Sequence, residues 1–355
     1  MNDDSDRDSA LGEQHSPTTT SITSSAYAYR YELGRRYHAF EAENYMLPND
    51  DNEAERLDLQ HHAFRLTLGG ALYLSPIPDD VQSVLDVGCG TGIWAIDFAD
   101  EHPSASVVGI DLSPIQPNEV PPNCSFVIDD AEKEWLYNDQ YDFVHERMLC
   151  FGIRDWSRIF QQTFLHLKPG GWIECQEACF PPRCVSNPLL TPEDSPYLDW
   201  SNRLIRAASL IGVDLTAPRS FSDHLQNCGF VDIRAHQYKW PIGPWPKDKE
   251  ARKLGCYVKE NMFDFLQAAS LALFTKVLKM SRSEIEVLLS EVRKDINGKE
   301  RFVLSIGVWC ARKPLVGEHG NNNHALFSWL PTPGALAVTP EPDDNLSEQQ
   351  HLDQE

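Results

Sequence analysis

Short apolar runs alternate with longer amphipathic segments through the middle of the chain. Five runs have the length and composition of buried parallel strands: residues 83–87 (SVLDV), 107–111 (VVGID), 125–128 (SFVI), 141–145 (YDFVH) and 172–175 (WIEC). One helix is predicted from about Ile93. Another is predicted over 156–167, with Phe160, Phe164 and Leu167 on one face, and residues 168–171 (KPGG) end it. This alternation predicts a doubly wound α/β fold with a mostly parallel sheet and helices on both faces.

Two further strands are predicted nearer the C-terminus. Residues 230–233 (FVDI) start a sixth strand, and residues 301–309 (RFVLSIGVW) form a seventh. Helices are expected between them. For the last helix, Ser283 and Glu286 have the spacing of a capping box, and Gly298 follows the expected end. Its apolar face comprises Ile285, Leu288, Leu289 and Val292.

The two ends of the chain differ in composition from the middle. Residues 1–26 are rich in Ser, Thr, Asp and Asn, and residues 313–355 are rich in Gly, Asn, Pro and acids, so both are expected to be disordered acidic tails. Residues 27–76 are expected to form an N-terminal helical cover. Residues 77–312 are expected to form the main domain, with insertions around 178–225 and 240–298. The apolar fraction of 41% is sufficient for a packed core.

The charge balance narrows the class of partner. Lys and Arg number 31 against 53 Asp and Glu, which gives a formal net charge of −22. Such a surface repels phosphate backbones, so direct nucleic-acid binding is not expected. No run of about 18 apolar residues is present, so no membrane span is expected, and the predicted location is the cytoplasm or the nucleus.

The nine cysteines are an odd number and are scattered along the chain, as expected for reduced thiols. Cys175, Cys179 and Cys184 lie close together, but no His completes a zinc spacing, so no metal site is expected.

A glycine-rich turn follows the first predicted strand, where doubly wound sheets bind ligands. Residues 86–92 read DVGCGTG, so Gly88, Gly90 and Gly92 have the spacing G-x-G-x-G and not the G-x-G-x-x-G of dinucleotide binders. An acid two residues before the first glycine would sit badly beside a pyrophosphate but well beside an ammonium group. Asp86 therefore favours S-adenosylmethionine over a dinucleotide, with Cys89 in the same turn.

Acids also end the second and third predicted strands. Asp111, followed by Leu112, can accept hydrogen bonds from both ribose hydroxyls, and Asp130 can accept from the adenine amino group while the Ala131 N–H donates to the ring. Each acid taken alone could instead be a solvated turn residue or a helix cap. In this order on a βαβαβ frame, the three acids predict a clamp for adenosine.

These motifs resemble class I methyltransferases, and in particular the fungal LaeA-like and UMTA-type methyltransferases. The likeness runs from about residue 31 to residue 312. It is carried by residues 34–38 (GRRYH), 90–96 (GTGIWAI), 111–117 (DLSPIQP), 129–132 (DDAE), 141–145 (YDFVH), 167–172 (LKPGGW) and 243–247 (GPWPK). The resemblance implies a Rossmann-like sheet of seven strands, with the seventh antiparallel beside the fifth and N-terminal helices over the cofactor. Cys89 replaces the Thr that is frequent in the fungal family, but Cys is usual in the wider class.

The sequence signals for residues that would line the methyl-acceptor side of the site are less specific. His145 ends the fourth strand beside the expected methyl position. There it could line the site or act as a general base, and in either case it should affect turnover more than cofactor retention. The equal alternative is a structural His that is hydrogen-bonded to backbone. Tyr37, with Arg36 and His38, could fold over the cofactor from an N-terminal helix, or simply pack. His61 and His62 point in different directions on a predicted helix and receive no role. Weaker candidates for the acceptor pocket are Glu177, Tyr197, Trp200 and Trp240.

Two functions follow from the resemblance. The first is transfer of a methyl group from S-adenosylmethionine to O, N or C of a small molecule in fungal secondary metabolism. The second is a LaeA-like regulator of secondary-metabolism genes that acts through a protein partner.

Overall fold

The computed structural model describes residues 29–38, 40, 45–136 and 140–318. The expected acidic tail at 1–26 and nearly all of the one at 313–355 lie outside these residues. Within the described part, none of the helices combines the length and apolar content needed to cross a bilayer.

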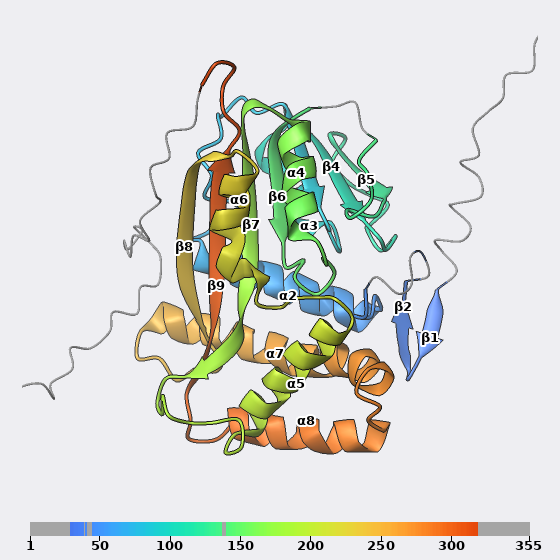
Figure 1. Cartoon of the computed structure of the whole chain (residues 1–355), viewed down its shortest axis with the longest axis vertical. Helices are drawn as coiled ribbons and strands as arrows, with labels where there is room; N and C mark the ends of the chain where they lie inside the picture. Colours follow the sequence, from blue (N-terminus) through green and yellow to red (C-terminus); the bar gives the residue numbers. More distant parts are fainter. Residues whose placement is uncertain (1–28, 39, 41–44, 137–139, 319–355) are drawn as a thin grey trace, which may run out of the picture.

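The centre of the molecule is a seven-stranded sheet with the strand order β5-β4-β3-β6-β7-β9-β8 (Figure 1). Strands β3 to β7 pair in parallel, whereas β9 pairs antiparallel with both β7 and β8. The antiparallel strand beside the fifth parallel strand confirms the arrangement that the resemblance implies. The strands are β3 (Ser83–Val87), β4 (Ser106–Asp111), β5 (Cys124–Ile128), β6 (Tyr141–Arg147), β7 (Leu167–Cys184), β8 (Val231–Pro241) and β9 (Phe302–Arg312).

Helices cover both faces of this sheet, as consecutive residues of β6 show. The His145 ring stacks on Trp94 of α3, whereas the Glu146 carboxylate accepts a hydrogen bond from Thr163 of α4. Because neighbouring residues of a strand point to opposite faces, α3 and α4 lie on opposite sides of the sheet. The flanking helices are α3 (Ile93–Glu101), α4 (Trp156–His166) and α6 (Phe221–Asn227).

A second group of helices lies beyond the carboxyl ends of the parallel strands (Figure 1). In this group α2 packs against α7, and α5 and α8 pack against α7 and against each other. The predicted insertions at 178–225 and 240–298 supply three of these helices. The bounds are α2 (Asp51–Thr67), α5 (Pro196–Leu210), α7 (Lys249–Lys276) and α8 (Arg282–Ile296), with a 3₁₀ turn η1 (Ala217–Ser220) before α6.

Two local predictions are wrong. Helix α8 has its capping box at Ser281 and Glu284, two residues before the predicted pair, because the side chain of Ser281 accepts from the Glu284 N–H and the Glu284 carboxylate accepts in return. The N-terminal segment around Tyr37 forms a hairpin of β1 (Arg30–Glu32) and β2 (Arg35–Tyr37) and not a helix. Leu33 and Gly34 have positive φ angles, which reverse the chain at this point.

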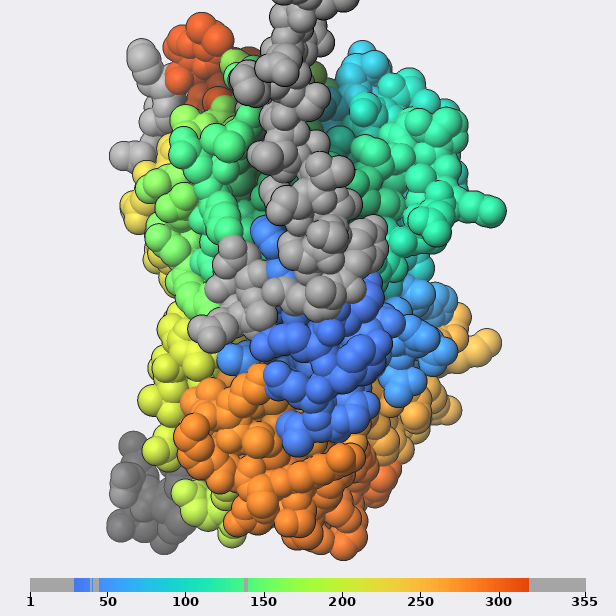
Figure 2. Space-filling model, turned by 90° about the vertical axis from the view of Figure 1, so that its right-hand side faces the viewer, coloured from blue at the N-terminus to red at the C-terminus, as the bar shows by residue number. Residues whose placement is uncertain are grey.

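The hairpin and α2 together form the N-terminal cover. Figure 2 shows these residues, in blue, between the helical layer of α7 and α8 and the side of the molecule that carries β4 and β5. The cover therefore lies next to the carboxyl ends of the strands, where the predicted site residues are found.

Candidate functional site

In the glycine turn after β3, residues without a side chain place the backbone at the surface of a cavity. Gly88, Gly90 and Gly92 have φ angles of +65°, +56° and +80°, a region that residues with a Cβ rarely adopt. A Cβ on Gly88 would also collide with the Leu149 side chain, and one on Gly92 with the Phe126 ring. Gly92 is the N-cap residue of α3. The backbone conformation thus favours glycine at all three positions, and close packing adds to this at Gly88 and Gly92.

The carboxylate of Asp86 is oriented by a hydrogen bond from a buried histidine. The carboxylate is 2% exposed, and its Oδ1 lies 2.7 Å from Nδ1 of His145, whose ring is parallel to Trp94 with centroids 3.7 Å apart. Burial lowers the pKa of His145, which favours the neutral imidazole with its proton on Nδ1. Asp86 Oδ2 and His145 Nε2 are buried and have no hydrogen-bond partner. The pair therefore presents one oriented carboxylate with an unused acceptor.

Asp111 connects the glycine turn with the loop that follows β4. Its Oδ2 accepts from the Gly90 N–H at 2.9 Å, and its Oδ1 accepts from the Ser113 N–H at 2.8 Å. Burial raises the pKa of Asp111 to about 6, although the two backbone donors oppose this shift. The carboxylate is ionised at neutral pH, and each oxygen has a lone pair left for a hydroxyl donor.

Hydrogen bonds hold the loop that follows β5. Asp130 is 5% exposed, and its Oδ1 accepts from the Glu132 N–H at 3.0 Å. The Ala131 carbonyl accepts from Gln162 Nε2 and from Trp135 Nε1, both at 3.0 Å. These bonds hold the loop after β5 in the position where it lines the cavity.

The cavity spans the ends of four strands and has about 1150 Å³ of empty space, counting the solvent at its open mouth. This is the scale of a small-molecule pocket. The sheet side is lined by Asp86, Gly88, Cys89, Gly90, Asp111, Leu112, Asp130, Ala131 and His145. The rest of the lining includes Tyr45, Pro48, Asn49, Glu53, Leu57 and Gln60 from the segment that leads into α2 and from α2 itself, and Arg147, Met148, Leu149, Gly152 and Ile153 from the end of β6 and the residues that follow it.

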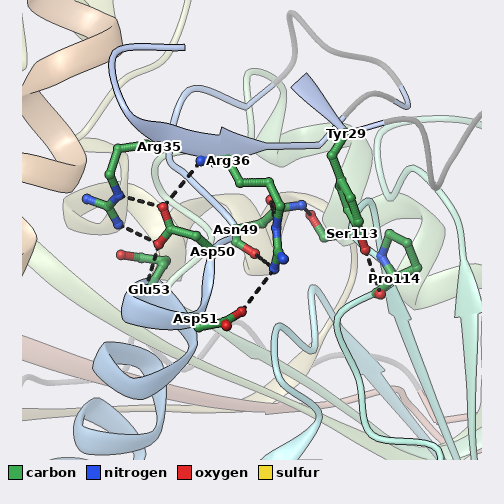
Figure 3. Close-up of polar contacts among 9 residues, drawn as sticks. All are labelled: Tyr29, Arg35, Arg36, Asn49, Asp50, Asp51, Glu53, Ser113 and Pro114. Carbon is green, nitrogen blue, oxygen red and sulfur yellow. Dashed lines mark hydrogen bonds and ion pairs between the residues drawn. The ribbon is translucent and has the colours of Figure 1, made fainter. Parts of the chain in front are cut away.

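The N-terminal cover is tied to this cavity through a polar network (Figure 3). Arg36 donates from Nη2 to the Asn49 carbonyl at 2.6 Å, and Asn49 donates from Nδ2 to Ser113 Oγ at 3.3 Å. Tyr29 donates its hydroxyl to the Pro114 carbonyl at 3.2 Å. The hairpin is thereby joined to the loop whose Ser113 N–H orients Asp111.

The same hairpin is also joined to α2. Arg35 forms a two-pronged ion pair with Asp50, at 2.6 and 2.8 Å, and Asp50 is the N-cap residue of α2. In Figure 3 the Arg35 and Arg36 side chains lie on either side of Asp50 and Asn49. Asn49 and Asp50, directly before α2, thus connect the hairpin to that helix and to the cavity.

Comparisons with known proteins agree with this geometry. A family model described as a methyltransferase domain matches residues 59–235. The methyltransferase pytC of Aspergillus terreus is 40% identical over 297 residues, which cover 83% of this chain and 91% of pytC. The chain belongs to this LaeA-like methyltransferase family. A second member is the secondary metabolism regulator LAE1 of Cochliobolus heterostrophus, which is 35% identical over 80% of this chain and 94% of LAE1. A third is the protein-methionine methyltransferase laeA of Emericella nidulans, which is 34% identical over 81% of this chain and 77% of laeA.

The cofactor of this methyltransferase is S-adenosylmethionine, and the residues at the cavity fit it. The unpartnered Oδ2 of Asp86 suits an ammonium donor, and Gly88 and Gly90 of the glycine turn line the cavity. Asp111 carries two oriented acceptors, as a ribose with two neighbouring hydroxyls requires. Within the described residues no cluster of His, Cys, Asp or Glu is arranged to hold a metal ion.

The residues around Tyr37 support the methyltransferase cover and do not line its cavity. Tyr37 is 2% exposed, its hydroxyl has no partner, and burial raises its pKa to about 12. The two ring nitrogens of His38 lie 2.6 Å from the Phe40 carbonyl and 3.0 Å from the Tyr45 carbonyl. The prediction that Tyr37 contacts the cofactor therefore finds no support in its position.

The weaker candidates for the acceptor pocket are wrong, because all four are core residues and none lines the cavity. Trp200 donates to Ser270 Oγ at 2.8 Å, and Trp240 donates to Thr67 Oγ1 at 2.7 Å. Tyr197 stacks on Trp200 within the helical layer. Glu177 is fully buried on β7, where it accepts from the Leu149 N–H and where burial raises its pKa to about 8.

Several cavity residues were not anticipated from the sequence. Arg147 follows His145 by two residues, so strand periodicity could have placed both on one face. Leu57 and Gln60 lie at helical spacing on α2 and face the site. Tyr45 lies between predicted elements, and no pattern marks it.

Proposed function

We propose that this methyltransferase acts on a small molecule in fungal secondary metabolism. The observation that carries the proposal is the concave lining of the cavity, to which Tyr45, Leu57, Met148, Leu149 and Ile153 contribute apolar side chains. A concave pocket with apolar side chains suits a small molecule better than a folded protein surface. The name of pytC supports a methyltransferase role, and the net charge of −22 opposes a nucleic-acid acceptor.

The proposed division of roles follows the geometry of the cavity. Asp86 accepts from the cofactor ammonium, Asp111 from the ribose hydroxyls and Asp130 from the adenine amino group, while Ala131 donates its N–H to the ring. Gly88, Cys89, Gly90 and Leu112 supply the contact surface around them, and Gly92 shapes the turn. When bound, the cofactor supplies a methyl group activated by its sulfonium.

The chain then contributes mainly by positioning, which in well-oriented reactions accounts for roughly 7–11 kcal/mol of barrier. His145 is better placed to orient Asp86 than to serve as a base. Its Nδ1 is engaged, and its Nε2 is buried. A general base is therefore not assigned.

A second candidate function is regulation of secondary-metabolism genes through a protein partner, in the cytoplasm or the nucleus. The names of LAE1 and laeA favour it, and the latter name includes methylation of protein methionine. The two functions differ in the class of molecule that receives the methyl group.

The deciding experiment supplies methyl-labelled S-adenosylmethionine and a fungal extract, with Asp111→Ala as the matched inactive control. Small molecules and proteins are separated and analysed by mass spectrometry. The proposal expects label in a small molecule with the wild type and none with the variant. Label confined to protein, and dependent on Asp111, would contradict the proposal and support the regulatory function.

A further inference from the structure

Arg147 reaches the cavity as a cation without a counter-ion. It is the last residue of β6, it lines the cavity, and among the described residues no carboxylate lies within ion-pair distance of its guanidinium. The ring of Phe64 lies beneath it, with the guanidinium carbon 5.3 Å from the ring centroid. A partly buried guanidinium with apolar packing and no anion beside it is expensive unless a ligand supplies the anion.

A short relay fixes the direction of this guanidinium. Asp97 of α3 accepts from His61 Nε2 at 3.0 Å, and His61 Nδ1 lies 3.2 Å from both Nη1 and Nη2 of Arg147. Arginine has no acceptor, so Nδ1 must accept both bonds and the proton of the neutral ring must be on Nε2. Burial, together with the charge of Arg147, lowers the pKa of His61 and keeps it in this state. The remaining N–H groups of Arg147 are left for a ligand.

The protonation state of Arg147 suits an anion. Burial lowers its pKa to about 10, while the carboxylates of Asp86, Asp97 and Asp58 oppose this shift from a distance. The side chain is therefore still a cation at neutral pH. Beside it on the cavity wall is Gln60, which is 5% exposed and whose amide makes no hydrogen bond within the described part of the chain.

Two opposite charges lie close to the start of the glycine turn. In the pairing of β3 with β6, Asp86 lies opposite His145 and Val87 opposite Glu146, so Arg147 falls beside Gly88. Asp86 has an unused acceptor two residues before Gly88, and Arg147 has unused donors on the same face of the neighbouring strand. An amine and a carboxylate carried by the same carbon match this arrangement.

We propose that Arg147, held by Asp97 and His61 and assisted by Gln60, binds the carboxylate of the methionine half of the cofactor. Arg147 thereby completes a zwitterion site with Asp86. The proposal rests on the cofactor and not on the identity of the methyl acceptor.

The first test needs only the wild-type protein. Calorimetry compares S-adenosylmethionine with decarboxylated S-adenosylmethionine, which keeps the sulfonium and the amine but lacks the carboxylate. The expected preference for the carboxylated form is about ten- to a hundredfold, the range of a lost charge-assisted contact. Equal affinities would overturn the proposal and leave Arg147 for an anionic acceptor. This result is independent of whether small molecules or proteins are methylated.

The second test assigns the preference to Arg147. Arg147→Met keeps the packing over Phe64 and should abolish the preference, with the affinity for the decarboxylated cofactor nearly unchanged. Arg147→Lys should restore part of the preference. The matched control is Arg203→Met, which removes an exposed Arg on α5 paired with Asp199 and should retain wild-type behaviour. A full preference in folded Arg147→Met would refute the assignment.

His61 is a positioning residue in this scheme. His61→Phe removes the acceptor that fixes the guanidinium while keeping a ring at the same place. It should reduce the preference to a few-fold, and an unchanged preference would show that the relay is not needed.

Discussion

His145 provides the sharpest test of how the site is built. His145→Phe keeps a ring against Trp94, whose plane lies within 4° of the imidazole, but removes the Nδ1 donor to Asp86. Asp86 would then be a buried carboxylate whose oxygens both lack a partner, since Oδ2 already has none. The change therefore isolates one hydrogen bond from the surrounding packing.

The magnitude follows from that bond. A hydrogen bond to a charged group contributes about 1.5–3 kcal/mol, and the free energy of unfolding should fall by that amount. Because the ring contact with Trp94 is retained, the aromatic contribution should change little. The affinity for S-adenosylhomocysteine should also fall, by roughly tenfold or about 1.4 kcal/mol, because an unheld Asp86 no longer faces the ammonium.

Urea denaturation and calorimetry with S-adenosylhomocysteine measure the two quantities. Asp86→Asn and the double variant complete a cycle, in which the two changes should be strongly non-additive because they remove the same contact. A variant with unchanged cofactor affinity but a lower methylation rate would refute this reasoning. That outcome would restore the expectation that His145 acts mainly in turnover.

Two other predictions concern the ribose end of the cavity. Affinity for the cofactor should be constant above about pH 7 and fall as the pH drops through about 6. The reason is that protonation of Asp111 removes an acceptor for the ribose hydroxyls. Calorimetry at a series of pH values should show that Asp111→Asn binds the cofactor weakly and without this pH dependence. Asn49→Ala removes the hydrogen bond to Ser113, which at about 0.5–1.5 kcal/mol should weaken cofactor binding two- to tenfold by equilibrium titration. Asp51→Ala, in a side chain that is 94% exposed, is its control and should have no effect.

The sequence predicted the sheet well because its signals are local. Each parallel strand is a short buried run, the alternation with helices predicts parallel pairing, and the resemblance places the seventh strand beside the fifth. The hairpin around Tyr37 was predicted as a helix because the resemblance implies N-terminal helices over the cofactor. Its form depends on tertiary contacts, chiefly the ion pair of Arg35 with Asp50, fifteen residues away.

The same distinction applies to the site. Asp86 lies near the end of β3, Asp111 ends β4 and Asp130 lies two residues after β5, so a motif at one point of the chain places each of them. Arg147 acquires its role from His61 on α2 and Asp97 on α3, and no spacing in the sequence reports that contact. Trp200 and Trp240 show the converse error. A large aromatic residue near an insertion is more readily a core residue than part of a pocket.

The end of β6 explains why these contacts form one unit. His145 and Arg147 point to the face of α2 and α3, where one orients Asp86 and the other extends to the cavity, while Glu146 between them points to α4. A slip of one residue in the pairing with β3 would exchange the faces. It would bring Glu146, whose pKa burial raises to about 7, next to Asp86, and would remove both the donor of Asp86 and the cation beside Gly88. The register that buries the apolar residues of β6 is therefore also the register that places Asp86 and Arg147, with opposite charges, on one face of neighbouring strands at the glycine turn.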